Sequence, residues 1–512
     1  MRPLPFSPKK NRARNLGPGG EFYAAPTLIF SVNSRLRHVL DPTTKRLLPW
    51  VVAIAFFMQT LDGTILNTAL PTMAKDLGES PLRMQSIVIA YLLTVALFIP
   101  ASGWLADRFG TRRTFVAAVL LFCLGSLLCA LSPTLPWLVA ARVVQGVGGA
   151  LLLPVGRLAI LRAFPRSELL KVLSFVTIPG LVGPLLGPPL GGWLVEVASW
   201  HWVFLINLPV GVIGVFAAWR YMPDLRGAVG QKFDWPGFVM FSLGLVMVSL
   251  GLQGLGEQSL STVVSILLVI GGLAAMAAYW VHASRAEKPL FSLTLFQIPT
   301  FSVGILGNLF SRLGSGAMPF LTPLFLQVGL GYSPSAAGLT MVPIVLGAMT
   351  IKFVAERVIN RFGYRRVLVV NTLLLGGFIA GFALVDRSTP HAAILVYLAL
   401  FGICNSMQFT AMNTLTLGDL DDARASGGNS LLSVVMQLSM SLGVAAAGAL
   451  LAAFATPIVI PIASDVGPSN VVRTFHATYL CMGALSALAA GIFFQLDRGE
   501  GPTGPAAVID HG

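Results

Sequence analysis

Two segments of the sequence occur twice, and each pair is separated by the same 253 positions. The letters LGESP at 77–81 return as LGYSP at 330–334, and RFGTRR at 108–113 returns as RFGYRR at 361–366. The common offset indicates one duplicated architecture. In each copy, an apolar stretch long enough to cross a bilayer lies between the two segments. A duplicated set of membrane helices is typical of secondary transporters, whose binding site lies between two related halves.

The composition places most of the chain in lipid. Of its 512 residues, 55% are apolar and 11% are charged, whereas a soluble domain carries about 25% charged residues. This much apolar side chain cannot be buried in a water-soluble protein of this length, so we expect an all-α integral membrane protein. The pattern predicts fourteen helices, near 49–69, 86–106, 114–132, 136–159, 172–194, 202–219, 236–254, 262–283, 300–325, 336–355, 367–385, 391–414, 427–453 and 475–496.

The offset between the repeats also predicts how these helices are grouped. Two directly joined six-helix units would give an offset of about 200 residues, and the surplus of about 50 residues corresponds to two further spans. We therefore expect a 6 + 2 + 6 arrangement with a basic, disordered N-terminal extension. For that extension, a start of translation near Val39 or Leu40 stays open as a second explanation. The expected units are the extension (1–48), a six-helix bundle (49–220), a linker with an inserted two-helix hairpin (221–299), a second six-helix bundle (300–496) and a tail (497–512).

The formal net charge of +13 indicates topology and does not indicate a nucleic-acid partner. Lys and Arg are concentrated in the N-terminal tail and in every second loop, and the loop cations on the other side are Lys75, Arg83, Arg387 and Arg473. The positive-inside rule then places both termini in the cytoplasm. No basic patch interleaved with aromatic residues suggests nucleic-acid binding.

The four cysteines are expected to be packing residues, because Cys123, Cys129, Cys404 and Cys481 all fall inside apolar stretches. None forms a pair with metal-ligand spacing, so we expect no metal.

The loop between the second and third predicted helices carries the most specific motif. Gly103 permits close helix packing, Gly110 permits a tight reversal, and Asp107 can cap a turn or pair with a cation on a neighbouring helix. The cations that hold this loop at the inner leaflet are Arg108, Arg112 and Arg113.

The second copy of the loop keeps the cations and the turn but changes the acidic position. It contains Arg361, Gly363 and Arg365, whereas Asn360 stands where Asp107 is expected. Glu356 stands one helical turn earlier, at the position of Gly103. A charge lock in this half would therefore use Glu356 and a different partner.

These motifs carry a family resemblance. The loop at 103–113 resembles the signature loop of the major facilitator superfamily, and RVVQGVGGA at 142–150 resembles its fourth-helix motif. The segment GLVGPLLGPPLGG at 180–192 resembles the fifth-helix motif of exporting antiporters. The strings that resemble the fourteen-helix drug:proton antiporter family are LDGTILNTALP at 61–71, WHWVFLINLP at 200–209 and FDWPG at 233–237. The resemblance implies the major facilitator fold, a monomer, and transport driven by a proton gradient without a cofactor.

Two charged residues inside predicted helices are candidates for proton coupling. Asp62 lies deep in the first helix, where an ionised carboxylate is costly unless it is paired or hydrated, and protonation relieves that cost. Arg142 lies inside the fourth helix and needs an anionic or carbonyl partner. Protonation of Asp62 would release a pair with Arg142 and bias a conformational equilibrium. A purely structural ion pair stays open for both residues.

The fifth predicted helix is expected to be a packing surface that bends. Its small residues are Gly180, Gly183, Gly187, Gly191 and Gly192. Pro184 removes a backbone hydrogen bond and loosens the helix. Ordinary close packing without bending is the alternative.

Polar residues within the helices suggest where a substrate cavity lies. The candidate lining residues are Gln59, Asn67, Asn308, Arg312 and Gln408. Arg312, in the middle of the ninth helix, would suit an anionic substrate, and an ion pair between helices is an equal alternative.

The function expected from these observations is proton-coupled export by alternating access. We expect drugs or toxic compounds to be exported across the bacterial inner membrane by a multi-pass protein that is not an enzyme. Its partners would be protons, a small-molecule substrate and the lipid bilayer. An exporter of small carboxylate metabolites stays open as an alternative, and a non-transporting membrane sensor is a more distant one.

Overall fold

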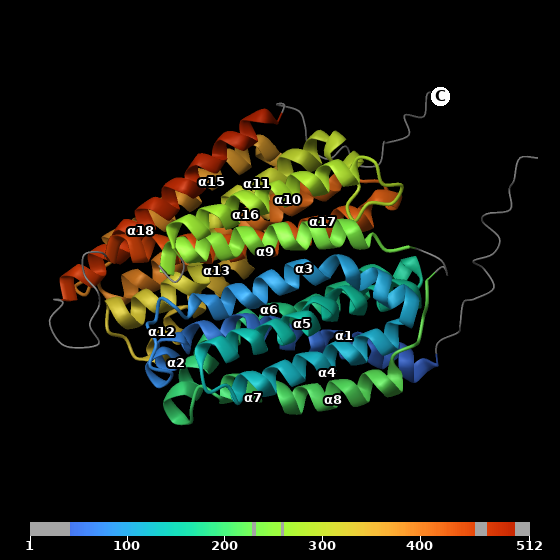
Figure 1. Ribbon diagram of the computed structural model, residues 1–512, viewed down its shortest axis with the longest axis horizontal. Helices are drawn as coiled ribbons and strands as arrows, with labels where there is room; N and C mark the ends of the chain where they lie inside the picture. The colour runs from blue at the N-terminus through green and yellow to red at the C-terminus, as the bar shows by residue number, and fades with distance from the viewer. Residues whose placement is uncertain (1–40, 228–231, 258–260, 456–467, 497–512) are drawn as a thin grey trace, which may run out of the picture. The chain divides into compact units, whose positions relative to one another are not determined.

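Each long apolar segment forms a helix, because in lipid a helix satisfies its backbone hydrogen bonds internally. The structure is a computed structural model that describes residues 41–227, 232–257, 261–455 and 468–496. Within these ranges the regular secondary structure is entirely helical (Figure 1). The predicted basic extension up to residue 40 and the tail 497–512 lie outside the described residues.

The helices of the first repeat are α1 (Pro42–Ile65), the 3₁₀ turn η2 (Leu66–Thr68), α2 (Leu70–Asp76), α3 (Gln85–Phe109), α4 (Thr111–Ala130), α5 (Leu135–Ala163), α6 (Arg166–Val197), α7 (Trp202–Leu205) and α8 (Asn207–Tyr221). Between the repeats lie α9 (Trp235–Glu257), α10 (Thr262–Ala283) and η3 (Leu293–Gln297). The second repeat contains α11 (Pro299–Leu324), the π-helical turn η4 (Phe325–Gly329), α12 (Pro334–Thr340), α13 (Val342–Ile351), α14 (Ala355–Phe362), α15 (Tyr364–Gly381), η5 (Phe382–Leu384), α16 (His391–Gly418), α17 (Asp422–Ala455), α18 (Pro468–Leu488) and η6 (Ala489–Gln495).

The predicted membrane spans all coincide with helices. Among the described residues, 13 helical segments are long and apolar enough to cross a membrane. Helix α11 is a further helix of 26 residues that carries the cation Arg312 in its interior. Large apolar side chains also remain exposed, such as Leu384 at 85% and Phe353 at 81%, as expected for a surface that faces lipid. Helix α1 begins at Pro42, earlier than the start near 49 that hydropathy predicted.

Two pairs of glycines show the sequence repeat in the backbone itself. Gly78 and Gly331 adopt φ angles of 66° and 79°, and Gly110 and Gly363 adopt 94° and 78°. The members of each pair are separated by the same 253 positions as the repeated segments. Positive φ is accessible to glycine at little cost, so each copy ends its helices at matched positions.

Helices α9 and α10 pack against each other between the repeats. Their backbones touch at two glycines, since a Cβ atom on Gly272 would lie 2.7 Å from the carbonyl oxygen of Gly244. Helix α9 also packs against α17 of the second repeat and contacts α3 of the first, where Phe238 and Phe98 have ring centroids 5.9 Å apart. The hairpin therefore touches both repeats.

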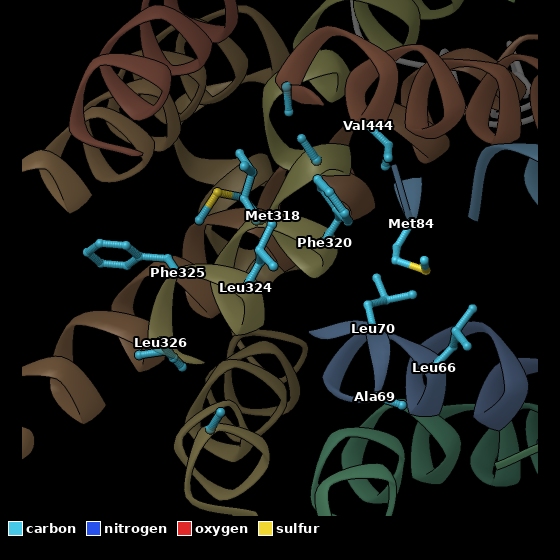
Figure 2. Close-up of a cluster of buried hydrophobic side chains, with 14 of the residues drawn as sticks. Leu66, Ala69, Leu70, Met84, Met318, Phe320, Leu324, Phe325, Leu326 and Val444 are labelled. Carbon is cyan, nitrogen blue, oxygen red and sulfur yellow. The ribbon is translucent and has the colours of Figure 1, made fainter. Parts of the chain in front are cut away.

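One hydrophobic cluster joins the two repeats at the end of the bundle that carries α2, which we name the α2 end (Figure 2). The opposite end, which carries the 107–113 loop, is named the loop end. In Figure 2, Leu66, Leu70 and Met84 of the first repeat lie opposite Phe320 and Val444 of the second. All five are at most 2% exposed, so the α2 end is closed by apolar packing.

Candidate functional site

A buried carboxylate lies at the centre of the first repeat. Asp62 of α1 is 1% exposed, and its Oδ2 accepts a hydrogen bond of 2.9 Å from Nη1 of Arg142 on α5. Its Oδ1 accepts two more, from Nε2 of Gln145 at 2.8 Å and from Nδ2 of Asn207 at 3.0 Å. Both oxygens of an ionised carboxylate are thereby satisfied.

The network continues into α4, so that four helices meet at Asp62. Oγ of Ser126 accepts hydrogen bonds from Gln145 at 2.8 Å and from Asn207 at 3.3 Å. Arg142 also donates to Oε1 of Gln145 at 2.5 Å. A buried ion pair is stable only when further hydrogen bonds satisfy its remaining groups, and these polar side chains supply them.

Local sequence explains how α5 presents these groups. Arg142 and Gln145 are three residues apart and therefore lie on one face of the helix. Gly148 lets α5 approach α4 closely, since a Cβ atom there would lie 2.5 Å from the backbone nitrogen of Phe122. The guanidinium carbon of Arg142 lies 4.2 Å from the centre of the Tyr91 ring, a cation–π contact that positions the cation from the α3 side.

A pocket between the two repeats adjoins this ion pair. Its wall is formed by Gly63, Leu66, Asn67, Val88, Tyr91, Leu92 and Arg142 of the first repeat and by Gly316, Pro319, Phe320, Met440 and Val444 of the second. Arg142 therefore belongs both to the Asp62 network and to the pocket wall. Its Nε atom and the hydroxyl of Tyr91 are buried without a hydrogen-bond partner among the described residues.

The five residues proposed for the cavity are distributed over different places. Asn67 lies in the pocket wall, and the other four do not. Gln59 of α1 has a buried Oε1 without a partner among the described residues. Gln408 lies between α15 and α16, where it binds Asn371 and Thr372 at 2.7 Å each, so the structure places it in helix packing.

Arg312 and Asn308 form a separate polar site on α11. Nε of Arg312 donates to Oδ1 of Asn308 at 2.9 Å, and its guanidinium carbon lies 4.7 Å from the centre of the Phe409 ring. The Nη2 atom of Arg312 is buried without an acceptor among the described residues. The second repeat therefore holds a cation that the described residues do not neutralise.

The signature loop is held by an ion pair and by two hydrogen bonds to the segment that follows α8. Asp107 at the end of α3 pairs with Arg162 at the end of α5. Gly110 ends α3 with a positive φ, and Thr111 then binds the segment after α8: its N–H donates to the carbonyl of Leu225 at 3.0 Å, and its hydroxyl donates to that of Pro223 at 2.8 Å.

The loop cations face outward. Arg108 and Arg113 are exposed, and Arg112 is half-buried. The guanidinium carbon of Arg108 lies 5.5 Å from the centre of the Trp104 ring. Gly103 lies on an open face, where a Cβ atom would meet nothing within 4 Å, so its expected role in close helix packing is not seen.

The second copy of the loop lacks the corresponding lock. Helix α13 ends at Ile351 and α14 begins at Ala355, whereas α3 is continuous through the same region of the first copy. Glu356 and Arg361 are exposed, and within the described ranges Glu356 forms no ion pair. Gly363 keeps the turn, and Arg365 lies near Phe494, 5.9 Å from its ring centre. The charge lock anticipated at Glu356 is therefore not formed here.

The glycines of α6 form a surface for α1. A Cβ atom would collide with Phe56 from Gly180, with Thr60 from Gly183, with Thr64 from Gly187 and with the Ile65 carbonyl from Gly191. Pro184 lies inside α6, which is helical from Arg166 to Val197. The neighbouring Gly192 instead faces the second repeat, where a Cβ atom would collide with the backbone of Pro334.

Hydrogen bonds between the repeats lie at the α2 end. Nε2 of Gln327 donates to the carbonyl of Thr68 at 3.0 Å. The backbone N–H of Ser335 donates to Glu196 at 2.9 Å, and its hydroxyl donates to the other carboxylate oxygen. The two repeats are thus held together at this end by polar as well as apolar contacts.

Groups suited to other chemistry are not seen in the described part of the chain. No cluster of three or more His, Cys, Asp or Glu residues there could hold a metal ion. Cys123, Cys129, Cys404 and Cys481 are free and at least partly buried.

A family model described as Major Facilitator Superfamily matches residues 52–443 and, in an overlapping second match, residues 304–509. The chain belongs to this superfamily. It is accordingly a multi-pass membrane transporter and not an enzyme.

Individual members of the superfamily match along most of their length. A protein of Pectobacterium atrosepticum, provisionally named multidrug resistance protein MdtD, is 53% identical over 453 residues, which are 88% of this chain and 96% of the relative. A protein of the same name from Salmonella heidelberg is 50% identical over 462 residues, 89% of this chain and 96% of the relative.

Solved structures of distant superfamily transporters share the fold. A bacterial homologue of the lysosomal transporter Spinster, in an inward-facing and unoccupied conformation, gives a TM-score of 0.64 at 17% identity, over 89% of this chain and 98% of that one. A D-xylose–proton symporter gives 0.60 at 15% identity, over 87% and 96%.

Several residues of the network were not recognised from sequence. Ser126, Gln145, Asn207 and Tyr91 are uncharged, and single polar residues in apolar helices are common. A signal was nevertheless present for two of them. Gln145 stands one turn after Arg142, and Asn207 lies in the family-like string at 200–209.

Proposed function

We propose that this superfamily transporter is a proton-coupled exporter of drug-like small molecules in the bacterial inner membrane. The observation that carries the proposal is the position of Arg142, which pairs with Asp62 and also lines the pocket between the repeats. A group that belongs to both sites can link proton binding to substrate binding. The names of the MdtD relatives support multidrug substrates.

Proton coupling would act through the Asp62–Arg142 pair. In the paired state the carboxylate is ionised and holds Arg142 through Oδ2. A proton arriving from outside neutralises Asp62 and removes the charge that holds the guanidinium in place. Arg142 then loses its anionic partner, and the balance between the two end states of the transporter shifts.

Alternating access would use the two repeats as two six-helix bundles that rock around the pocket. If the positive-inside rule places the loop end in the cytoplasm, the contacts at the α2 end close the pocket on the outer side. Glu196 with Ser335 and Gln327 with Thr68 would then separate when the transporter opens outward. The Asp107–Arg162 pair would hold the inner ends of α3 and α5 together. The functional unit in this proposal is a monomer.

Substrate-induced proton movement in proteoliposomes tests the proposal. Lipophilic cations such as ethidium and rhodamine 6G should release protons from wild-type protein, and Asp62→Asn should reduce the signal at least about tenfold, because its charge can no longer be titrated. Asp386→Asn, in an exposed loop, is the control and should behave as wild type. Equal responses of Asp62→Asn and wild type would reject Asp62 as the proton carrier.

The second candidate function is export of small organic anions, and Arg312 is the observation that favours it. Its cation lies on α11, the equivalent of α1, and the described residues do not neutralise it. An anionic substrate would satisfy the free Nη2 atom. Proton release triggered by succinate or benzoate alone, lost in Arg312→Gln and kept in the exposed-site control Arg357→Gln, would favour this function over drug export.

A further inference from the structure

We infer that the molecule held in the pocket between the repeats has an apolar body and one hydrogen-bond-accepting oxygen, which Tyr91 and Arg142 bind. The inference rests on the proposed export function and names the chemistry that the same pocket selects. It makes Tyr91 a specificity-determining residue, a role that hydropathy and motif analysis did not assign to it.

The pocket wall is apolar apart from three side chains. The larger apolar members are Leu66, Val88, Leu92, Phe320, Met440 and Val444. The polar side chains are Asn67, Tyr91 and Arg142. The wall contains no carboxylate, since Asp62 is not among the lining residues. An apolar body therefore matches most of the surface.

Two of the polar side chains carry hydrogen-bond donors that have no acceptor among the described residues. Tyr91 is 4% exposed and Arg142 is 1% exposed, so both are shielded from bulk water. Nη1 of Arg142 is committed to Asp62 and Gln145, but its Nε and the Tyr91 hydroxyl have no partner among the described residues. A buried donor without an acceptor is costly. A ligand that offers an acceptor removes that cost, and one that offers only donors does not.

The position of Tyr91 is set by packing on two sides. Its ring lies over the guanidinium of Arg142, with the centroid 4.2 Å from the guanidinium carbon. Its hydroxyl lies against α5 at Gly149, where a Cβ atom would be 2.7 Å from the oxygen. The absence of a side chain at Gly149 therefore leaves room for the hydroxyl, and the phenol is held in one orientation.

The arrangement also relates ligand binding to the proton site. The Nε–H of Arg142 is a different donor from the Nη1–H that binds Asp62, and an arginine can hold acceptors on both edges at once. The acceptor oxygen can therefore bind while the Asp62–Arg142 pair is intact. The ligand would bind to the deprotonated state, which agrees with proton release on binding in the proposed antiport cycle.

Two fluorescent probes of similar shape and charge test the inference on the purified full-length protein. Rhodamine 6G and ethidium are planar lipophilic cations, and rhodamine 6G carries ester and ether oxygens whereas ethidium carries none. Tyr91→Phe removes the hydroxyl and keeps the ring over Arg142. It should weaken rhodamine 6G binding about five- to tenfold, as expected for one lost hydrogen bond, and leave ethidium binding unchanged.

Two further variants keep the test decisive. Gly149→Ala should displace the hydroxyl without altering Tyr91 and should produce the same selective loss. Tyr479→Phe removes the hydroxyl of another fully buried tyrosine, on α18 and outside the pocket wall, and should change neither affinity. Equal losses for both probes in Tyr91→Phe, or none, would overturn the inference and leave the export function standing. Absence of binding and of proton-coupled transport for both probes in wild type would overturn the export function and the inference with it.

Discussion

Glu196 accepts two hydrogen bonds from Ser335, one from its backbone N–H at 2.9 Å and one from its hydroxyl. Glu196 lies at the end of α6 in the first repeat, and Ser335 lies at the start of α12 in the second. Beside them, Gly338 approaches the backbone of Pro188 so closely that a side chain would not fit. This contact is therefore a junction between the repeats at the α2 end.

Weakening this junction should populate a state that is open at the α2 end. Glu196→Ala removes both hydrogen bonds. Because the carboxylate is exposed, we expect the free-energy difference between the closed and open states to change by about 1 kcal/mol or less. The ratio of open to closed molecules should then rise by up to about fivefold. Double electron–electron resonance between spin labels at Ala198 and Ser388, both exposed at this end, measures the distance distribution. Glu168→Ala, which breaks a pair with Lys45 at the other end of α6, is the matched control. An unchanged distribution in Glu196→Ala would show that apolar packing alone closes the α2 end.

Removal of Arg142 alone should destabilise the folded protein more than removal of the whole ion pair. Arg142→Met leaves the Asp62 carboxylate buried without its cation, and breaking a buried pair in this way costs about 3–5 kcal/mol. Adding Asp62→Asn should recover most of that loss, because the remaining amide can hydrogen-bond with Gln145 and Asn207. Thermal unfolding in detergent gives both values, with the exposed Arg357→Met as the control. A double variant no more stable than Arg142→Met would contradict this account of the network.

The two copies of the signature loop should respond differently to loss of their acidic residue. Asp107→Asn removes the ion pair with Arg162 and should lower the transport rate about three- to tenfold, because α3 and α5 lose a partly buried charge contact. Glu356→Gln should have no effect, since Glu356 is exposed and pairs with no cation in the described ranges. Transport assays on both variants at equal protein level make the comparison. An equal defect in Glu356→Gln would mean that a second lock forms in another conformation.

The anchoring of the inserted hairpin should depend on pH through Asp234. Burial opposes ionisation of this carboxyl, but hydrogen bonds from the Gly237 and Leu290 N–H groups and from His282 hold its pKa below the usual value. A group whose pKa is lower in the folded state stabilises it above the unfolded pKa, and that stability is lost as the pH falls through the folded pKa.

Hydrogen exchange at the Gly237 and Leu290 amides measures this anchoring. Asp234→Ala should raise exchange at both amides at pH 7, by an amount that corresponds to about 1–3 kcal/mol. At a pH low enough to protonate the wild-type carboxyl, wild type and variant should exchange alike. A smaller protection factor of the two amides in wild type at pH 7 than at pH 3, with each rate divided into the intrinsic exchange rate at its own pH, would reverse the predicted sign.

The sequence determined the features that depend on composition and on spacing along the chain. Apolar runs placed the helices, and the offset of 253 positions predicted both the repeat and the hairpin between its copies. Asp62 and Arg142 could be proposed as partners because an embedded charge in lipid requires one. The turns at Gly110 and Gly363 follow from local backbone conformation, which glycine alone reaches easily.

Only the tertiary structure decided which polar groups meet. It joined Gln145 and Asn207 to Asp62 and to Ser126. It also placed Tyr91 over Arg142, and it separated Gln408 and Arg312 from the pocket between the repeats. It also brought Glu196 to Ser335 across 139 positions of sequence. The physical reason is that membrane helices are apolar on most sides, so their hydrophobic pattern does not fix rotation about the helix axis. That rotation follows from close packing between helices at glycines such as Gly148 and Gly183, and packing depends on the whole bundle.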